Sequence, residues 1–111
     1  MWLCHNKGLF SIVDYIDPKN PSKQSGEVLV RSRHKDHIPD VFPEYADDMV
    51  HTPTHDYAYR VRVKKEEVAK KAHSMIMDID YSNFKNSVDN NNLRKTYGNF
   101  WLDAVRTFHR A

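Results

Sequence analysis

The sequence contains little cysteine, little glycine and no long apolar run. Cys4 is the single cysteine among 111 residues, so no disulfide can form within the chain and a reducing compartment is favoured. No stretch reaches the roughly 18 apolar residues of a membrane span, and the first residues lack the pattern of a signal peptide. We therefore expect a single domain over residues 1–111 in the cytoplasm, without a membrane partner.

Charge of one sign is not in large excess. The chain has 17 lysines and arginines against 15 acidic residues, which gives a formal net charge of +2. That charge predicts a polyanionic partner only if the positive side chains cluster on one surface. The sequence also has no Ser–His–Asp arrangement, glycine-rich phosphate loop or dinucleotide fingerprint, so no cofactor is predicted.

Three segments have the composition of β-strands. They are rich in β-branched and aromatic residues, and a turn with two prolines, residues 17–27, separates the first two. In the third segment, Tyr57, Tyr59, Val61 and Val63 alternate with alanine and arginine, which is the period of a half-buried strand. The predicted strands are residues 8–16, 27–33 and 49–63.

Two later segments change to a helical period. Residues 64–80 and 92–110 each carry an apolar stripe at three- and four-residue spacing. A short helical turn is also expected near residues 38–42, where prolines exclude a longer helix. This order predicts an α+β domain with a three-stranded, antiparallel sheet, covered on one face by two main helices.

The stretch DIDYSNFK, residues 78–85, interrupts the first apolar stripe. Along a straight helix, Phe84 and Val88 would point away from the side that the earlier apolar residues occupy. We therefore expect the first helix to kink or restart near Asp80. Asp80 or Ser82 would cap the new turn, because their side-chain oxygens can accept from free backbone N–H groups.

The same stretch admits a metal-binding interpretation. Asp78 and Asp80 are two residues apart, and a kink would bring their carboxylates together around Mg²⁺. His51 and His55 have the four-residue spacing of a metal pair, although Pro53 disfavours a regular helix there. These four residues support an alternative function as a small metal-dependent nuclease or phosphohydrolase.

Arginines recur on the predicted strands at two-residue spacing. If the second and third strands are neighbours, four of them share the sheet face opposite the helices, where guanidinium forks could bind carboxylate or phosphate. Few aromatic residues are expected on that face, and pairing with Asp14, Asp56 or Asp78 is the structural alternative. The candidate binding residues are Arg31, Arg33, Arg60 and Arg62.

Several motifs resemble a family of short bacterial and phage proteins without an assigned activity. The similar residues are Trp2, GLFSIV (8–13), DYAYR (56–60), DIDYSNFK (78–85) and Trp101. The resemblance covers most of the chain, with departures in the longer 17–27 loop and the histidine-rich middle. It implies no mechanism and no residue roles.

The sequence as a whole favours a non-enzymatic binding domain. It would dock an acidic protein surface or a nucleic-acid backbone on the arginine face, and a phage-borne gene would suit a modulator of a host machine by analogy. A third possibility is a homo-oligomer joined through the aromatic helix, because residues 93–108 carry enough apolar surface for an interface.

Overall fold

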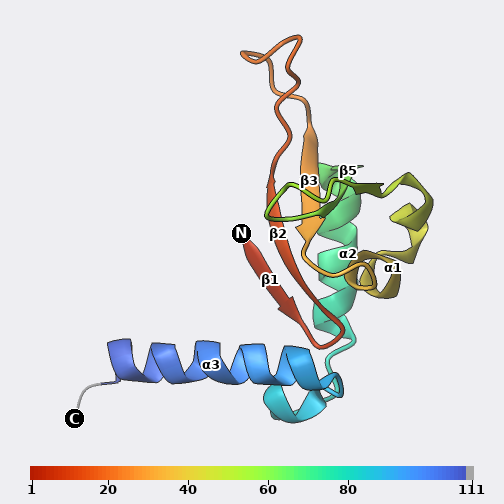
Figure 1. Cartoon of the computed structure of the whole chain (residues 1–111). Helices are drawn as coiled ribbons and strands as arrows, with labels where there is room; N and C mark the ends of the chain where they lie inside the picture. The colour runs from red at the N-terminus through yellow and green to blue at the C-terminus, as the bar shows by residue number, and fades with distance from the viewer. Residues whose placement is uncertain (110–111) are drawn as a thin grey trace.

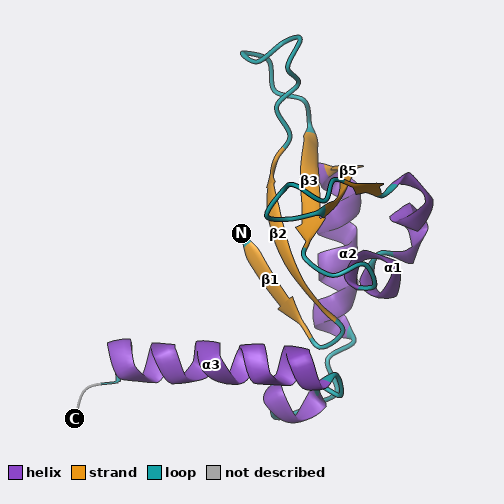
Figure 2. Cartoon of the chain, viewed as in Figure 1, coloured by secondary structure: helices purple, strands orange, loops and turns teal. Residues whose placement is uncertain are grey.

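The computed structural model describes residues 1–109 and has an α+β fold (Figures 1 and 2). One antiparallel sheet has the strand order β1-β2-β3-β5-β4. The strands are β1 (Trp2–His5), β2 (Gly8–Asp14), β3 (Glu27–Ser32), β4 (Val50–His51) and β5 (Tyr59–Lys64). The helical elements are α1 (His37–Val41), η1 (Pro43–Asp48), α2 (Lys65–Met77), η2 (Lys85–Ser87) and α3 (Asn91–Phe108).

The α+β class is confirmed, but a three-stranded sheet understates the structure. The predicted strand 49–63 is interrupted, because the chain leaves β4 at His51 and returns as its antiparallel partner β5. Pro53 lies in the connecting loop, 52–58, which the Thr52 N–H closes by donating to the Ala58 carbonyl at 2.7 Å. The additional strand β1 forms a hairpin with β2 across the two residues Asn6 and Lys7.

The main core lies between the inner face of the sheet and α1 and α2. Val28 and Val30 of β3 are opposite Val63 and Val61 of β5, and all four are buried. Alternation along each strand therefore places one apolar row against the helices. The predicted turn near 38–42 is confirmed as α1, whose Ile38 is fully buried in this core.

The first long helix does not restart near Asp80. α2 ends at Met77, Asp78 occupies its C-cap, and the next long helix begins only after Asn90. The side chain of Asn90 caps α3, because its Oδ1 accepts from two backbone N–H groups at 3.0 Å each. The intervening residues form a loop and η2, so the predicted caps Asp80 and Ser82 have no such role.

A second, smaller core forms where α3 meets the β1–β2 hairpin. Val88, Leu93 and Tyr97 are buried there, and Phe84 packs against them. The predicted change of packing side after residue 80 is therefore correct, although these residues form a separate cluster. The predicted cover of one sheet face by two helices is wrong for α3, which projects sideways from the sheet (Figure 1).

A buried hydroxyl attaches α3 to the sheet. The Tyr97 Oη lies 2.8 Å from the His5 carbonyl oxygen and 2.9 Å from that of Gly8, at the two ends of the hairpin turn. Burial raises the pKa of Tyr97 far above its usual range, so the hydroxyl remains a donor. Gly8 itself has no room for a side chain, since a Cβ would lie 2.7 Å from the Phe10 ring.

The change Tyr97→Phe is expected to lower the free energy of unfolding by about 1–3 kcal/mol. Its reason is that two buried carbonyl groups lose their shared donor while the ring stays in place. Urea unfolding followed by circular dichroism measures this loss. Tyr15→Phe is the matched control, because the Tyr15 hydroxyl is exposed and meets the Arg62 side chain. Equal effects of the two changes would contradict the proposed attachment.

A second prediction concerns the loss of folding stability at acidic pH. The Nδ1 of His37 accepts the Leu9 N–H at 3.3 Å, and desolvation followed by the nearby His34 lowers the pKa of His37 below its ordinary value. The unfolded chain therefore binds the proton more readily, so stability present at neutral pH is lost as the pH falls through the folded pKa. The variant His37→Gln should flatten this loss between about pH 7 and pH 5 in urea titrations. An unchanged pH profile would contradict it.

Candidate functional site

The arginines predicted from the sequence share the outer face of the sheet, opposite α2. The strands β3 and β5 are neighbours, and their register places Arg31 directly opposite Arg60. This pair belongs to one row that crosses all five strands. The row consists of Trp2, Ser11, Arg31, Arg60 and Val50. Arg62 lies two residues further along β5 on the same face, and Arg33 follows β3.

The loop 52–58 crosses this face in front of β2 and β3 (Figure 1). Its Tyr57 ring lies against two guanidinium groups, with 4.6 Å from the ring centroid to Arg31 Cζ and 4.1 Å to Arg33 Cζ. The Tyr57 carbonyl also accepts from the Arg60 guanidinium at 3.1 Å. The predicted strand period groups Tyr57 with the inward-facing row of Tyr59, Val61 and Val63. That grouping is wrong for Tyr57, because β5 begins only at Tyr59 and the strand period does not extend into the loop.

Two of the arginines are neutralised by carboxylates, one exposed and one half-buried. Arg33 pairs with Asp56 at 3.0 Å and Arg62 pairs with Glu27 at 2.7 Å. Hydrogen bonding to these carboxylates raises the pKa of each guanidinium. Of the pairings expected from the sequence, Asp56 is confirmed, whereas Asp14 pairs with Lys65 and Asp78 lies at another site. Such solvent-exposed pairs are easily exchanged for another anion.

The pair Arg31 and Arg60 differs, because within the described part of the chain neither forms an ion pair. One guanidinium N–H of Arg31 donates to Ser11 Oγ at 2.7 Å, but the Nε atoms of Arg31 and Arg60 are both buried without a protein acceptor. Like charges directly opposite each other in an antiparallel pair are destabilising, and an unpaired buried donor adds a cost. An anion at this face would offset the repulsion between the two charges, so this pair is the electrostatic centre of the face.

Aromatic side chains border the arginines, which corrects the expectation of few aromatic residues on this face. Trp2, in the same row, is 68% exposed and stacks on Phe100 of α3 with ring centroids 6.2 Å apart. A cavity of about 240 Å³ lies between Trp2, Arg33, Tyr57 and Phe100. The expectation missed Trp2 because β1 was not predicted; the Asn6–Lys7 turn between two apolar runs is the signal that could have found it.

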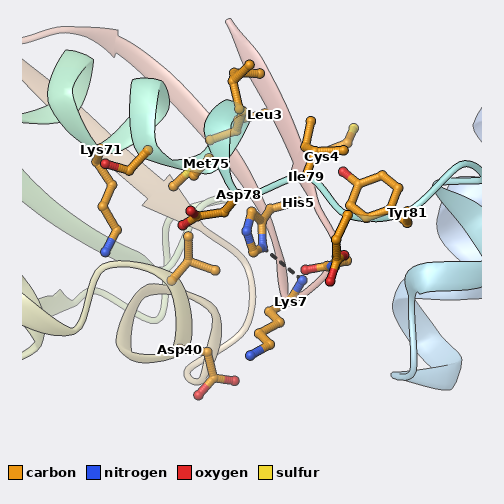
Figure 3. A pocket seen from close by; sticks show the side chains of 15 residues that line it. Leu3, Cys4, His5, Lys7, Asp40, Lys71, Met75, Asp78, Ile79 and Tyr81 are labelled. Atoms are coloured by element: carbon orange, nitrogen blue, oxygen red, sulfur yellow. Dashed lines mark hydrogen bonds between the residues drawn. The ribbon is translucent and has the colours of Figure 1, made fainter.

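A second hollow lies on the other side of β1, between the end of α2 and α1 (Figure 3). It has a volume of about 390 Å³, and both Asp78 and Asp80 contribute to its lining. The other two predicted metal residues are elsewhere, since His51 stacks on Tyr59 and His55 lies in the loop 52–58. Among residues 1–109, no three His, Cys, Asp or Glu side chains are grouped to hold a metal ion.

His5 is the central side chain of this second hollow (Figure 3). Its Nδ1 accepts the backbone N–H of Lys7 at 3.0 Å, so a neutral ring carries its proton on Nε2. Desolvation, with Lys7 and Lys71 as further causes, lowers the pKa of His5, which keeps the ring neutral at pH 7. Desolvation also raises the pKa of the adjacent Cys4 thiol, which disfavours the nucleophilic thiolate. The hydrolytic alternative would therefore have Asp78 and Asp80 in this hollow without His51 and His55.

Comparisons with known proteins add no assignment. Scans of family models, curated proteins and solved structures find no match to this chain. Among the described residues, no helix is both long and apolar enough to cross a membrane. The outer sheet face therefore has to be interpreted from its own geometry.

The ion pair between Arg33 and Asp56 at the rim of this face should contribute little to the free energy of unfolding. Arg33→Ser is expected to change the free energy of unfolding by about 1 kcal/mol or less, because both partners are more than half exposed. Arg60→Ser should cost more, since it leaves the Tyr57 carbonyl without its donor. Urea unfolding of both variants measures the difference, and a larger loss for Arg33→Ser would make Arg33 a structural residue.

Proposed function

We propose that the protein is a non-enzymatic domain that binds single-stranded nucleic acid on the outer face of its sheet. The observation that carries this proposal is the pair of half-buried, unneutralised arginines, Arg31 and Arg60, in one cross-strand row with an exposed tryptophan. Proteins that bind single strands combine a positive surface for the backbone with aromatic platforms for the bases.

The arginines would contact the phosphate groups of the strand. Arg33 and Arg62 are accessible at the rim, and a phosphate oxygen can replace Asp56 or Glu27 with little loss, because exposed ion pairs contribute little. The positive field of Arg31 and Arg60 remains uncompensated beneath them. Guanidinium forks suit the bidentate recognition of phosphate, so this arrangement supports an anionic backbone lying along the face.

The bases would stack on the aromatic side of the same row. Trp2 presents an exposed ring beside the cavity that Arg33 and Tyr57 line, so a base could stack within reach of a phosphate contact. Stacking of this kind tolerates any base sequence, because every base has a π-face. An acidic protein surface would use the arginines alone, whereas the tryptophan favours a ligand with planar groups.

The test is the anisotropy of labelled single-stranded DNA and RNA at increasing salt. The double variant Arg33→Ser/Arg62→Ser should weaken binding about tenfold or more and reduce the salt slope by about 0.7 for each lost contact. Lys95→Ser/Arg106→Ser is the matched control, because it removes the same charge from exposed positions of α3. The control should bind like the unchanged protein.

Trp2→Ala separates base stacking from charge. It should weaken binding to an ordinary oligonucleotide about tenfold and leave binding to an abasic strand unchanged. No binding to any single strand at low salt would contradict the proposal. Equal weakening by the control double variant would also contradict it, and displacement of the strand by polyglutamate alone would favour an acidic protein partner.

A further inference from the structure

The outer half of α3 carries an apolar surface that the rest of the described structure covers only in part, since Phe100 stacks on Trp2 and Lys85 Nζ lies 4.0 Å from the centroid of the Trp101 ring. Leu93 and Tyr97 are buried against the hairpin, but Phe100, Trp101 and Phe108 are 38%, 53% and 83% exposed. Figure 1 shows this part of the helix extending beyond the sheet. A helical segment with few packing contacts is marginally stable in water, so the exposed stripe requires an explanation.

The stripe continues the face that the domain already buries. At about 100° per residue, five apolar side chains fall within an arc of about 80°. They are Leu93, Tyr97, Trp101, Ala104 and Phe108. By the same geometry Lys95, Asp103 and Arg106 point away from the stripe. A partner over the outer stripe therefore buries none of these three side chains, but it meets Lys85, whose Nζ lies 4.0 Å from the Trp101 ring centroid.

We propose that a second copy of this chain covers the stripe, with the two α3 helices antiparallel. The stripe is nearly palindromic about Ala104 and Val105, with a large ring three residues away on each side. An antiparallel pair centred there places Trp101 of one copy beside the partner's Phe108, twice by symmetry. The small Ala104 at the centre permits the close approach of two helices, at about 8 Å between axes.

The shape permits this arrangement, and the available area limits its strength. Because α3 is attached only through its first half, antiparallel pairing of the outer halves keeps the two sheets at opposite ends (Figure 1). At about 200 Å² for each aromatic side chain, Trp101 and Phe108 of the stripe leave about 270 Å² uncovered per copy. The rings of two copies, about 540 Å² in total, fall below the roughly 1,200 Å² of stable specific interfaces, so the dimer should be weak.

Sedimentation equilibrium at increasing protein concentration tests the proposal. The mass of the unchanged protein should rise toward that of a dimer, and Trp101→Ser or Phe108→Ser should keep it monomeric. Leu102→Ser is the matched control, since Leu102 is 37% exposed on the same helix but lies about 140° from Tyr97. The control should dimerise like the unchanged protein, with circular dichroism confirming that each variant retains its helices.

A cross-link supplies a second readout. In a Cys4→Ser background, Ala104→Cys should form a disulfide-linked dimer under mild oxidation, whereas Arg106→Cys on the opposite side should not. A monomer at every concentration, or equal cross-linking at both positions, would overturn the proposal. A tryptophan emission shift on adding phosphatidylserine vesicles to a monomeric protein would assign the stripe to a lipid surface and overturn self-association.

Discussion

The pairing of β3 with β5 is the constraint on which the rest of the structure depends. Its register sets Val30 opposite Val61 and Arg31 opposite Arg60, so one pairing creates both the apolar core and the charged face. A shift by one residue would turn the arginines inward and the valines toward water, which the burial of the core forbids. The position of the two unneutralised guanidinium groups therefore follows from the packing of the valines behind them.

The arginines of this face make structural contacts with a loop, and some of their N–H donors remain unpaired. The Tyr57 ring lies against the guanidinium groups of Arg31 and Arg33, and Asp56 forms an ion pair with Arg33. These contacts hold the loop 52–58 across the sheet. The buried Nε atoms of Arg31 and Arg60 remain without acceptors, and their charges face each other. Two opposed charges without a carboxylate partner do not favour stability, and this is the physical argument for the proposed anion-binding role of the face.

The helix α3, near the other end of the chain, likewise has a part with a structural role and a part that is exposed. Its first half is fixed by the Tyr97 hydroxyl on the hairpin carbonyls, and its second half extends the apolar stripe into solvent. The stack of Trp2 on Phe100 joins this helix to the charged face. Nucleic-acid binding and self-association would therefore use adjacent surfaces, and a dimer would bring two arginine faces into one particle.

The sequence by itself determined the α+β class, the face shared by the arginines and the change of apolar pattern near Asp80. Those features follow from local periodicity, which a strand or helix imposes on any sequence that it buries on one side. Only the tertiary structure decided that residues 49–63 form two strands, because Pro53 and a loop closure separate them. It also decided that Tyr57 covers the arginines, that Trp2 joins their row, and that Asp78 and His51 lie at different sites. These outcomes depend on contacts between residues distant in the sequence, and the path of a loop carries no periodic signal from which to predict them.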